Sequence, residues 1–492
     1  MSPPDGPALQ PDSGGVRGSS PSGTPPPLVL FGVPFHNVTL DESLAWIAAR
    51  AKSGRSCQIV TTNLDFILQA WKDPEMHRIH YEADLVVADG WPPVAFSKFF
   101  GPRLKERVAG SDIVPGLASV ARDQGLSIYA LGGKPGVAQE AMRILQERSS
   151  GLRVAGCGSP PLSTLLDMDH AAIRREIGDA KPDILLVAFG APKQDKWIRM
   201  NASRIGVPVS LGIGGSLDFI AGAQTRAPRW TRAIGMEWFW RLASQPTRLF
   251  RRYSSNLLFL IVMLSRLFAI RLLPAGRVVV PGGAAIQLPR LSSSEGAAEF
   301  CALHEAKVRT EGLVLSLSES TWLNSVELGA IAQLSRAARQ GGRALALLGV
   351  RSRVRRLLRL YRMERVVEIP ETPEAWSAFQ QNHFGPAAGR GTEWVDEGEL
   401  CRVVLPDQFE CGEAWRAQEE AERRAAAGKL RRVVVDGRRL RYIDSSGLHF
   451  LKTVLRCLDG IPGGAMSVRS FPEQALDLLR REGLGSIPSD GV

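Results

Sequence analysis

The sequence lacks the features that mark secreted and membrane-spanning proteins. Its six cysteines are scattered over 492 residues without a CxxC pair, and we expect them to be reduced thiols in the cytosol. Residues 1–27 lack the basic start and apolar core of a signal peptide, and their Pro, Gly and Ser content predicts a disordered tail. Arg266 and Arg271 interrupt the apolar stretch 257–273, so its unbroken run, 257–264, is shorter than the ~20 residues that a membrane span needs.

Acidic residues are nearly absent from residues 219–275. This segment holds one acid, Glu237, and nine arginines, so it carries +8 of the formal net charge of +11. A basic segment with interleaved aromatic residues seeks the phosphates of lipid, nucleotide or nucleic acid. We therefore expect the apolar helix at 257–273 to lie in a bilayer interface, with a core helix at a domain junction as the alternative.

What the sequence does contain is an alternation of short apolar runs and helical patterns from about Leu28 to Gly215. The expected strands are 57–61, 85–88, 126–131, 152–155, 184–189 and 207–211. Candidate helices between them are 112–124, 136–148 and 170–180. This alternation predicts an α/β, Rossmann-like domain whose parallel sheet is covered on both faces.

Polar or glycine pairs follow five of these strands, at the ends where open parallel sheets bind ligands. They are Thr62-Asn63, Asp89-Gly90, Gly132-Gly133, Lys193-Gln194 and Gly214-Gly215. Each pair alone is explained by a turn or a helix cap, but five pairs at one sheet edge indicate a site. Asp89 could act there as a general base, and partial burial would raise its pKa. The glycine turn after the third strand would offer backbone N–H groups to a diphosphate, although it is not a GxGxxG motif.

Two further patterns have simpler explanations than a metal site. Asp167 and Asp169 have the DxD spacing of many sugar-nucleotide transferases, but their position before an expected helix favours a helix cap. His77 and His80 lie beside glutamates, and a solvated helix face explains them better than metal ligation. We therefore expect no metal and no cofactor.

The chain changes character after Pro274, where two similar halves follow. Each half runs as strand, helix and strand, followed by a serine turn, and the turns at 322–331 and 442–451 align as WLNSVELGAI and YIDSSGLHFL. This weak duplication indicates two copies of one small α/β domain. The expected division of the chain is a tail (1–27), a sheet domain (28–218), an Arg/Trp-rich appendage (219–275), a first small domain (276–370), a linker (371–394) and a second small domain (395–492).

Residues 29–255 resemble the WecG/TagA/CpsF family, glycosyltransferase family 26. The motifs that carry the resemblance, in the family's order, are TTN (61–63), ADG (88–90), ERVAGSD (106–112), LGG (131–133), FGAPKQDKW (189–197), GIGGSLDFIAG (212–222), RAPRW (226–230) and MEWFWRL followed by PTRLFRRY (236–253). The resemblance implies an inverting transfer of a sugar from a UDP-sugar to a polyprenyl-diphosphate-linked saccharide. It places this reaction at the cytoplasmic membrane face, in exopolysaccharide or wall-polymer biosynthesis.

Matched to that family, Asp89 takes the position of the proposed catalytic base, and Thr62 and Gln194 those of residues that position the sugars. The remaining substrate-binding candidates are Asn63, Gly132, Gly133, Lys193, Gly214 and Gly215. Lys193 is the candidate for neutralising the departing diphosphate. The family motif PKQE is PKQD here, which leaves Gln194 intact. The residues expected to meet the membrane and the lipid diphosphate are Arg241, Arg248, Arg251 and Arg252.

The two small domains resemble STAS domains, in which the serine after the aspartate of a D-S-S/T-G turn can be phosphorylated by a partner kinase. The second copy keeps this pattern at 444–447, and we expect Ser445 to be exposed at a helix N-terminus. The first copy has Asn324 and Glu327 in place of the aspartate and glycine, and we expect a degenerate interaction module. Ser445→Asp is then predicted to weaken partner binding and to leave turnover almost unchanged.

These patterns together predict a glycosyltransferase, peripheral on the inner face of the cell membrane, with STAS modules that recruit or regulate it. Its expected partners are a UDP-sugar, a polyprenyl-diphosphate-linked acceptor, an anionic membrane surface and a protein partner or kinase, with a homo-oligomer as an open alternative. The main rival is a catalytically inactive STAS scaffold, and the intact Asp89 and Gln194 argue against it. We expect no nucleic acid partner, although the basic segment keeps a nucleic-acid binder as a third alternative.

Overall fold

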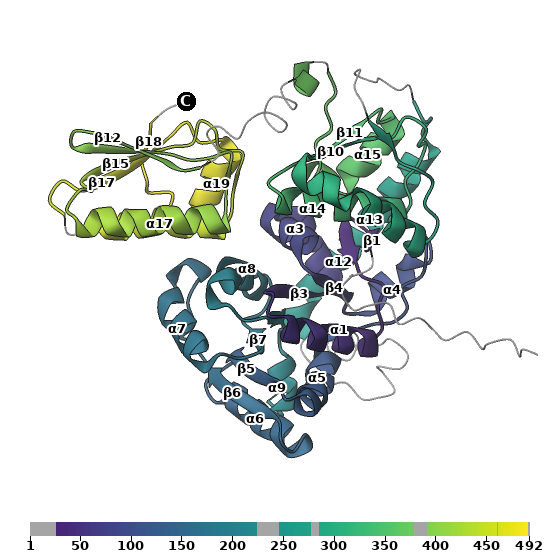
Figure 1. The fold of residues 1–492 in the computed structure, drawn as a ribbon, viewed down its shortest axis with the longest axis horizontal. Helices are drawn as coiled ribbons and strands as arrows, with labels where there is room; N and C mark the ends of the chain where they lie inside the picture. Colours follow the sequence, from purple (N-terminus) through teal and green to yellow (C-terminus); the bar gives the residue numbers. More distant parts are fainter. Residues whose placement is uncertain are drawn as a thin grey trace, which may run out of the picture.

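The chain folds around separate sheets in three parts, which Figure 1 shows side by side. The computed structural model describes residues 26–223, 246–276, 285–372, 374–377, 391–459 and 461–490. We call the three parts the N-terminal domain (28–223), the first module (285–377) and the C-terminal module (391–490). Most of the expected tail (1–25) and part of the Arg/Trp-rich appendage (224–245) lie outside the described residues. All six cysteines are free.

The N-terminal domain contains the predicted parallel sheet. Its strands are β3 (Cys57–Thr62), β4 (Leu85–Ala88), β5 (Ser127–Gly132), β6 (Arg153–Gly158), β7 (Ile184–Ala188) and β8 (Val209–Gly212). They lie in the order β4-β3-β8-β7-β5-β6, and every neighbouring pair is parallel. The expected strands and the α/β fold class are confirmed.

Both faces of this sheet are covered by helices, because its strands are apolar on both sides. Successive residues of β5 alternate: Ile128 packs with α1 (Leu40–Ser53), α5 (Gly110–Gln124) and α6 (Val137–Arg148), whereas Tyr129 packs with α7 (His170–Ala180) and α8 (Lys193–Ile205). Continuous burial of this kind is typical of parallel sheets, whose crossover helices lie on both faces. Helix α1 begins at a capping box, in which Thr39 and Glu42 each bond the other's backbone N–H.

The two modules repeat one order of elements, as the duplicated serine turns predict. The first module contains β9 (Ile286–Gln287), α13 (Ser294–Thr310), β10 (Leu313–Ser316), α14 (Ser325–Gln340), β11 (Leu345–Leu348) and α15 (Ser352–Leu360). The corresponding elements of the C-terminal module are β13 (Leu400–Val404), α17 (Cys411–Ala426), β15 (Arg432–Asp436), α18 (Ser445–Leu458), β17 (Ala465–Arg469) and α19 (Glu473–Arg481). Edge strands β12 (Glu393–Glu397) and β18 (Ser489–Asp490) extend the second sheet.

The first module shares a continuous hydrophobic core with the N-terminal domain. This core joins the hairpin β1 (Leu28–Leu30) and β2 (Val33–Phe35), the helices α2 (Leu64–Lys72) and α3 (Pro74–Glu82), and most of the first module. Hydrogen bonds cross the same boundary, among them Trp71 Nε1 to the Leu360 carbonyl at 3.2 Å. Because α3 is enclosed here, the predicted solvated face at His77 and His80 is wrong: both are buried, and desolvation lowers the pKa of His80 to about 4.

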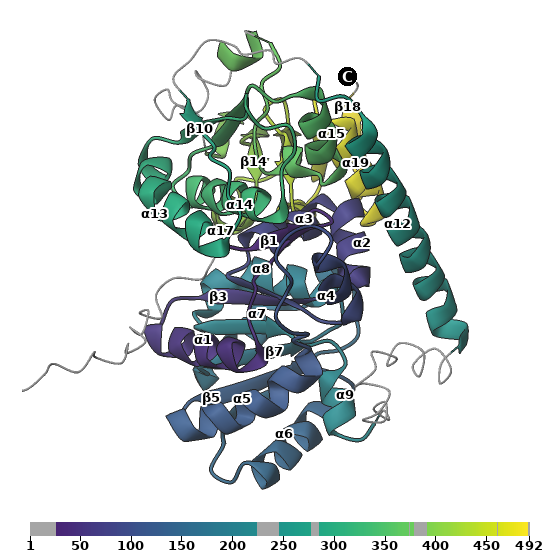
Figure 2. The ribbon, with the colours of Figure 1, turned by 90° about the vertical axis from the view of Figure 1, so that its right-hand side faces the viewer.

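Helix α12 (Pro246–Leu272) runs along one side of the molecule past α2 and α15 (Figure 2). Its inner face buries Phe259, Met263, Leu267 and Ile270 in the shared core. Its outer face exposes Leu257, Leu258, Ile261, Phe268 and Leu272. By length and composition Phe250–Leu272 could cross a membrane, but a third of that window, 33%, is buried inside the protein. The helix is therefore packed at a junction, as the second alternative of the sequence analysis predicts, and it also has an exposed apolar face.

Candidate active site

The polar strand ends lie on one edge of the sheet, as predicted. In the strand register Thr62 is opposite Ala88, Gly132 is opposite Ala188, and Val187 is opposite Gly212. The N–H of Asp89 also donates to the Thr62 carbonyl at 2.9 Å, so these two strand ends are joined directly. All five polar pairs therefore follow strands that end along the same carboxyl edge.

Asp89 is the half-buried carboxyl group of this edge. It follows β4, and Gly90, with φ of 123°, turns the chain from it into α4 (Trp91–Ser97). The neighbouring N–H of Val108 donates to the Ala88 carbonyl at 2.8 Å, so Arg107 lies next to the same strand end. Arg107, which forms an ion pair with Asp112 at 2.8 Å, is a cation that the sequence analysis passed over. Its signal was the ERVAGSD motif at 106–112.

The side chains of Thr62 and Asn63 form hydrogen bonds with other groups of the protein. Thr62 is fully buried, and its hydroxyl oxygen lies 3.0 Å from Nε2 of His80. The Asn63 side chain caps α2 by accepting the N–H groups of Asp65 and Phe66 at 3.0 and 3.2 Å. The Asn63 side chain is therefore explained as a helix cap. The buried Thr62 side chain contacts His80 beneath the end of its strand and does not face the solvent.

The glycine pairs allow close backbone packing at the edge. Gly132 has φ of 108°, and a Cβ there would lie 2.8 Å from the Ala188 carbonyl oxygen. The N–H of Gly133 donates to that same carbonyl at 3.2 Å. On the other side, Gly214 has φ of 53° and donates its N–H to Oε1 of Gln194 at 2.9 Å. These hydrogen bonds join the Gly132-Gly133 turn to the end of β7 and the Gly214 turn to the first turn of α8.

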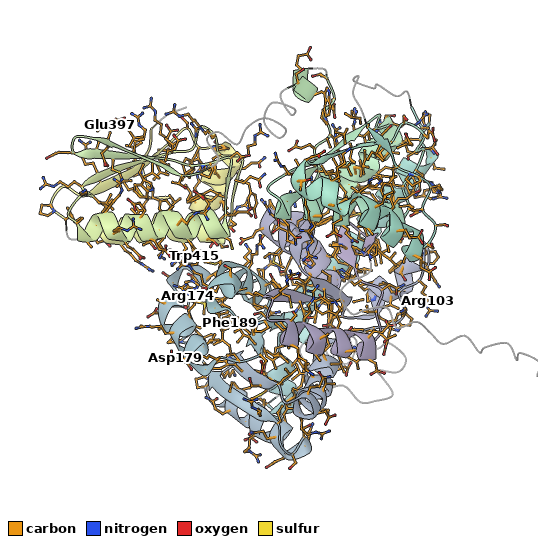
Figure 3. All side chains as sticks on the ribbon, viewed as in Figure 1. Arg103, Arg174, Asp179, Phe189, Glu397 and Trp415 are labelled. Carbon is orange, nitrogen blue, oxygen red and sulfur yellow. The ribbon has the colours of Figure 1, made fainter. Side chains whose placement is uncertain are left out.

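The first turn of α8 carries Lys193 and Gln194, but neither side chain points freely into solvent. Gln194 is only 1% exposed and holds the Gly214 turn. Lys193 donates from Nζ to the Ser163 carbonyl at 2.7 Å and lies 5.3 Å from the centre of the Phe189 ring, at the place that Figure 3 marks. Partial burial lowers the pKa of Lys193. In this arrangement both side chains act as supports for the edge.

Asp195 is an unusual buried acid beside this site. It is fully enclosed, and neither carboxyl oxygen makes a well-formed hydrogen bond within the described residues. Burial raises its pKa to about 7, and the adjacent Gln194 amide offsets only part of that effect. A Cβ on Gly212 would lie 2.9 Å from Oδ1 of Asp195, so only glycine fits above it.

The two aspartates of the DxD pair form hydrogen bonds and an ion pair within the protein. Asp169 caps α7 by accepting the Ala172 N–H at 2.9 Å, which confirms the expected helix cap. Asp167 accepts from Thr164 and pairs with Lys452 of the C-terminal module. In the part of the chain that the structure describes, no three His, Cys, Asp or Glu side chains gather as a metal site.

The structure describes the side chains of two of the four arginines expected at the membrane. Arg241 lies outside the described residues, as does the side chain of Arg248. Arg251 is exposed on α12. Arg252 forms an ion pair with Asp65 of α2 at 2.8 Å, so it ties α12 to the N-terminal domain.

The prediction that Ser445 is exposed is wrong. Its side chain is buried against α3: Oγ donates to Oε2 of Glu75 at 2.7 Å, and its N–H donates to Oε1 at 3.1 Å. Asp444 caps α18, and burial together with the nearby Glu75 raises the pKa of Asp444 to about 7. The first-module counterpart Ser325 is buried too, and its N–H donates to the Phe100 carbonyl at 3.2 Å. Both serine turns face the N-terminal domain, so a kinase cannot reach Ser445 in this arrangement.

Two protein families match this chain. Residues 28–272 match the WecG/TagA/CpsF glycosyl transferase family, and residues 291–375 match the STAS domain family. A Bacillus subtilis (strain 168) relative named N-acetylglucosaminyldiphosphoundecaprenol N-acetyl-beta-D-mannosaminyltransferase is 26% identical over 220 residues, 44% of this chain and 84% of the relative. A Staphylococcus aureus (strain NCTC 8325 / PS 47) relative with the same name is 28% identical over 214 residues, 43% of this chain and 82% of the relative.

One solved structure is also similar to a small part of the chain. The phosphorylated form of the Bacillus cell fate determinant SpoIIAA aligns with 20% of this chain and 92% of its own, at 14% identity and a TM-score of 0.19. The STAS match at 291–375 falls on the first module, which is the copy that lost the aspartate and glycine of the serine turn.

Proposed function

We propose that this chain is a hexosyltransferase that acts on a polyprenyl-diphosphate-linked saccharide, because residues 28–272 match the WecG/TagA/CpsF glycosyl transferase family and residues 291–375 match the STAS domain family. The donor in this proposal is a UDP-sugar, with an N-acetylmannosaminyl group as the first candidate, since that is the group named in both relatives. The product would serve exopolysaccharide or wall-polymer biosynthesis.

The observation that carries this proposal is the position of Asp89. It is a half-buried carboxyl group at the carboxyl edge of a parallel sheet, two strands from the Gly214 turn that the buried Gln194 side chain holds. Ligands of open α/β sheets bind at this edge. In the transfer, Asp89 would accept the proton of the acceptor hydroxyl while that oxygen attacks the anomeric carbon and the bond to the UDP oxygen breaks. The configuration at the anomeric carbon inverts.

Gln194 and Lys193 have a supporting role in this mechanism. Gln194 fixes the Gly214 turn, and Lys193 fixes the loop at Ser163, so together they shape the surface on which donor and acceptor would meet. Preorganised positioning of this kind contributes to catalysis because the reacting groups need not be arranged during the reaction.

The membrane part of the proposal is supported by α12. Its exposed apolar face, with Arg251 at its N-terminal end, has the composition of a helix that lies on an anionic bilayer. We place the protein on the inner face of the cell membrane, where a lipid-linked acceptor would reach the sheet edge.

The C-terminal module is proposed as a second STAS domain. It repeats the element order of the first module, and its serine turn keeps Asp444, Ser445, Ser446 and Gly447. The STAS pair supports a protein partner, which would bind a surface other than the buried serine turns.

A donor assay tests the proposed function. The full chain would be mixed with anionic vesicles that contain diphosphoundecaprenol-linked N-acetylglucosamine, and UDP release would be followed for a panel of UDP-sugars. We expect UDP-N-acetylmannosamine to give acceptor-dependent release and a disaccharide-linked lipid. Release that is independent of the acceptor, or no release with any donor, would contradict the proposal and favour the inactive scaffold.

A further inference from the structure

The C-terminal module sits against the N-terminal domain on the elements that carry the candidate site. In Figure 1 its helix α17 faces α7 and α8. The 3-10 helix η1 (Leu165–Asp167) contributes Leu166 to the hydrophobic core of this module. The module therefore contacts α8, which carries Lys193, and η1, which directly follows the loop that holds the partner of Lys193, Ser163.

Trp415 and Cys411 fasten the module to the backbone of α8. Trp415 is buried, and its Nε1 donates to the Met200 carbonyl at 2.7 Å. The Cys411 thiol donates to the Arg199 carbonyl at 2.8 Å. The Trp415 ring also lies under two guanidinium groups, 4.8 Å from Arg174 and 4.4 Å from Arg204, and Figure 3 shows it directed from α17 toward Arg174. Such cation–π contacts are strongest where the ring is shielded from water.

The 3-10 helix η1, directly after this loop, is held by the same module. Leu166 is buried in the module's core, and its carbonyl accepts a hydrogen bond from Arg456 at 3.4 Å. Lys452 forms an ion pair with Asp167 in the same turn. In the loop directly before η1, the Ser163 carbonyl accepts a hydrogen bond from the Lys193 ammonium. Lys193 thus bridges two segments that the C-terminal module holds independently.

A third contact closes this interface at the serine turn. Ser445 donates its hydroxyl and its N–H to the carboxylate of Glu75, which is buried at the N-terminus of α18. Lys196 of α8 pairs with the same carboxylate at 2.9 Å and with Asp73 at 2.8 Å. Lys196 lies one turn from Lys193 on α8, so the Ser445–Glu75 contact is joined to the site helix by one ion pair.

We propose that the C-terminal module is a structural part of the active site, in which Trp415 and Ser445 are positioning residues for Lys193 and Gln194. The proposal rests on the proposed function for its catalytic readout. A helix held at several backbone points moves as a unit, so release of the module would free α8 and the loop before η1 together. A change at Ser445 is then expected to alter turnover, contrary to the prediction from the sequence. The reason is that α8 carries part of the transferase site and is also joined to the serine turn through Lys196 and Glu75.

The test compares Ser445→Asp with Ser489→Asp in the full chain. The first change places a carboxylate against Glu75 in a buried contact, where like charges repel strongly. The second adds the same charge to the same module on the exposed edge strand β18. Hydrogen–deuterium exchange would follow 159–167 and 193–205, and kcat and donor KM would be measured by UDP release.

We expect Ser445→Asp to lose protection in both segments and to lower kcat by about tenfold or more with a smaller change in KM, because a displacement of ~1 Å can cost about 10²-fold in rate. Ser489→Asp should behave as wild type. Trp415→Phe keeps the ring and loses the bond to Met200, so it should give a weaker form of the same effect. Adding Glu75→Gln to Ser445→Asp removes the repulsion and should restore protection and kcat.

Unchanged protection and unchanged kcat in both Ser445→Asp and Trp415→Phe would overturn the proposal. Loss of protection confined to the C-terminal module would overturn it as well, because α8 would then be held without the module. If wild type releases no UDP with any donor, the proposed function fails, while the exchange measurement still decides whether the module holds α8.

Discussion

At the scale of single residues, the site combines one accessible acid with a layer of buried polar groups. Asp89 is half-buried at the edge, whereas Thr62 and Gln194 are enclosed and bond His80 and Gly214. Because Asn has nearly the size and shape of Asp, Asp89→Asn should remove the base and keep the fold. We expect Asp89→Asn to lower kcat by about 10²-fold or more, the usual scale for a lost general base, with an unchanged melting temperature. Near-normal turnover in the folded variant would exclude Asp89 from the mechanism.

Asp195 gives a residue-scale prediction about pH. Its pKa in the folded protein is about 7, above the ordinary value of 3.8, so the folded state holds this proton more tightly than the unfolded state. The free energy of unfolding should then fall as pH rises from about 4 to 7. Asp195→Asn removes this dependence and should be more stable than wild type at pH 8.

Urea denaturation of both proteins at pH 5 and pH 8 checks this sign. A tenfold change in proton affinity corresponds to about 1.4 kcal/mol, so the two proteins should differ by more than ~1 kcal/mol in how their stability responds to pH. If the free energy of unfolding changes with pH equally in wild type and variant, ionisation of the Asp195 carboxyl group does not destabilise the folded state, and the prediction is wrong. Burial and the nearby Glu75 also raise the pKa of Asp444, but this acid is present in both proteins and affects both pH responses equally.

At the scale of elements, α12 has two apolar faces with different environments. The inner face packs in the shared core, and the outer face is exposed through Leu257, Ile261 and Phe268. Replacing these three with serine should lower binding to anionic vesicles by at least tenfold, since a fully buried side chain of this size contributes about 1.5–3 kcal/mol. Vesicle flotation measures the loss.

A matched control for α12 is Leu303→Ser, which changes an exposed leucine on α13. This variant should float with the vesicles as wild type does. If the triple variant also floats unchanged, the outer face of α12 is not the membrane contact. Charge reversal at Arg251 then tests the basic end of the helix, because each arginine near an anionic surface contributes about 1 kcal/mol.

At the scale of the whole molecule, the three parts differ in whether they have a hydrophobic core of their own. The first module shares a core with one part of the N-terminal domain, the β1–β2 hairpin with α2 and α3, whereas the C-terminal module has its own core with Leu166 inserted from η1. We expect calorimetry to show a main transition for the shared core and a separate one for the C-terminal module. Met263→Ala should lower the main transition, since such truncations cost about 2–5 kcal/mol. Ser445→Asp should shift mainly the other transition and affect the main one less, through the loosened α8. Equal shifts of both transitions would contradict this division.

The sequence alone determined the sheet and its functional edge. Apolar runs such as 184–188 form strands because of their own residues, and polar pairs such as Asp89-Gly90 end the strands locally. Once the strands are parallel, these ends must share an edge, and the register of Thr62 with Ala88 shows that they do. The element order of the two modules was predictable for the same reason, because each serine turn recurs before a helix.

Only the tertiary structure decided which side chains are accessible. Ser445 lies at the predicted helix N-terminus, yet Glu75, 370 residues away in the chain, covers it. Likewise, α3 carries charged residues that predict a solvated surface, but the first module encloses it. The physical reason is that local sequence sets strand and helix formation, whereas the burial of a helix end depends on the shape and charge of a distant segment that docks on it.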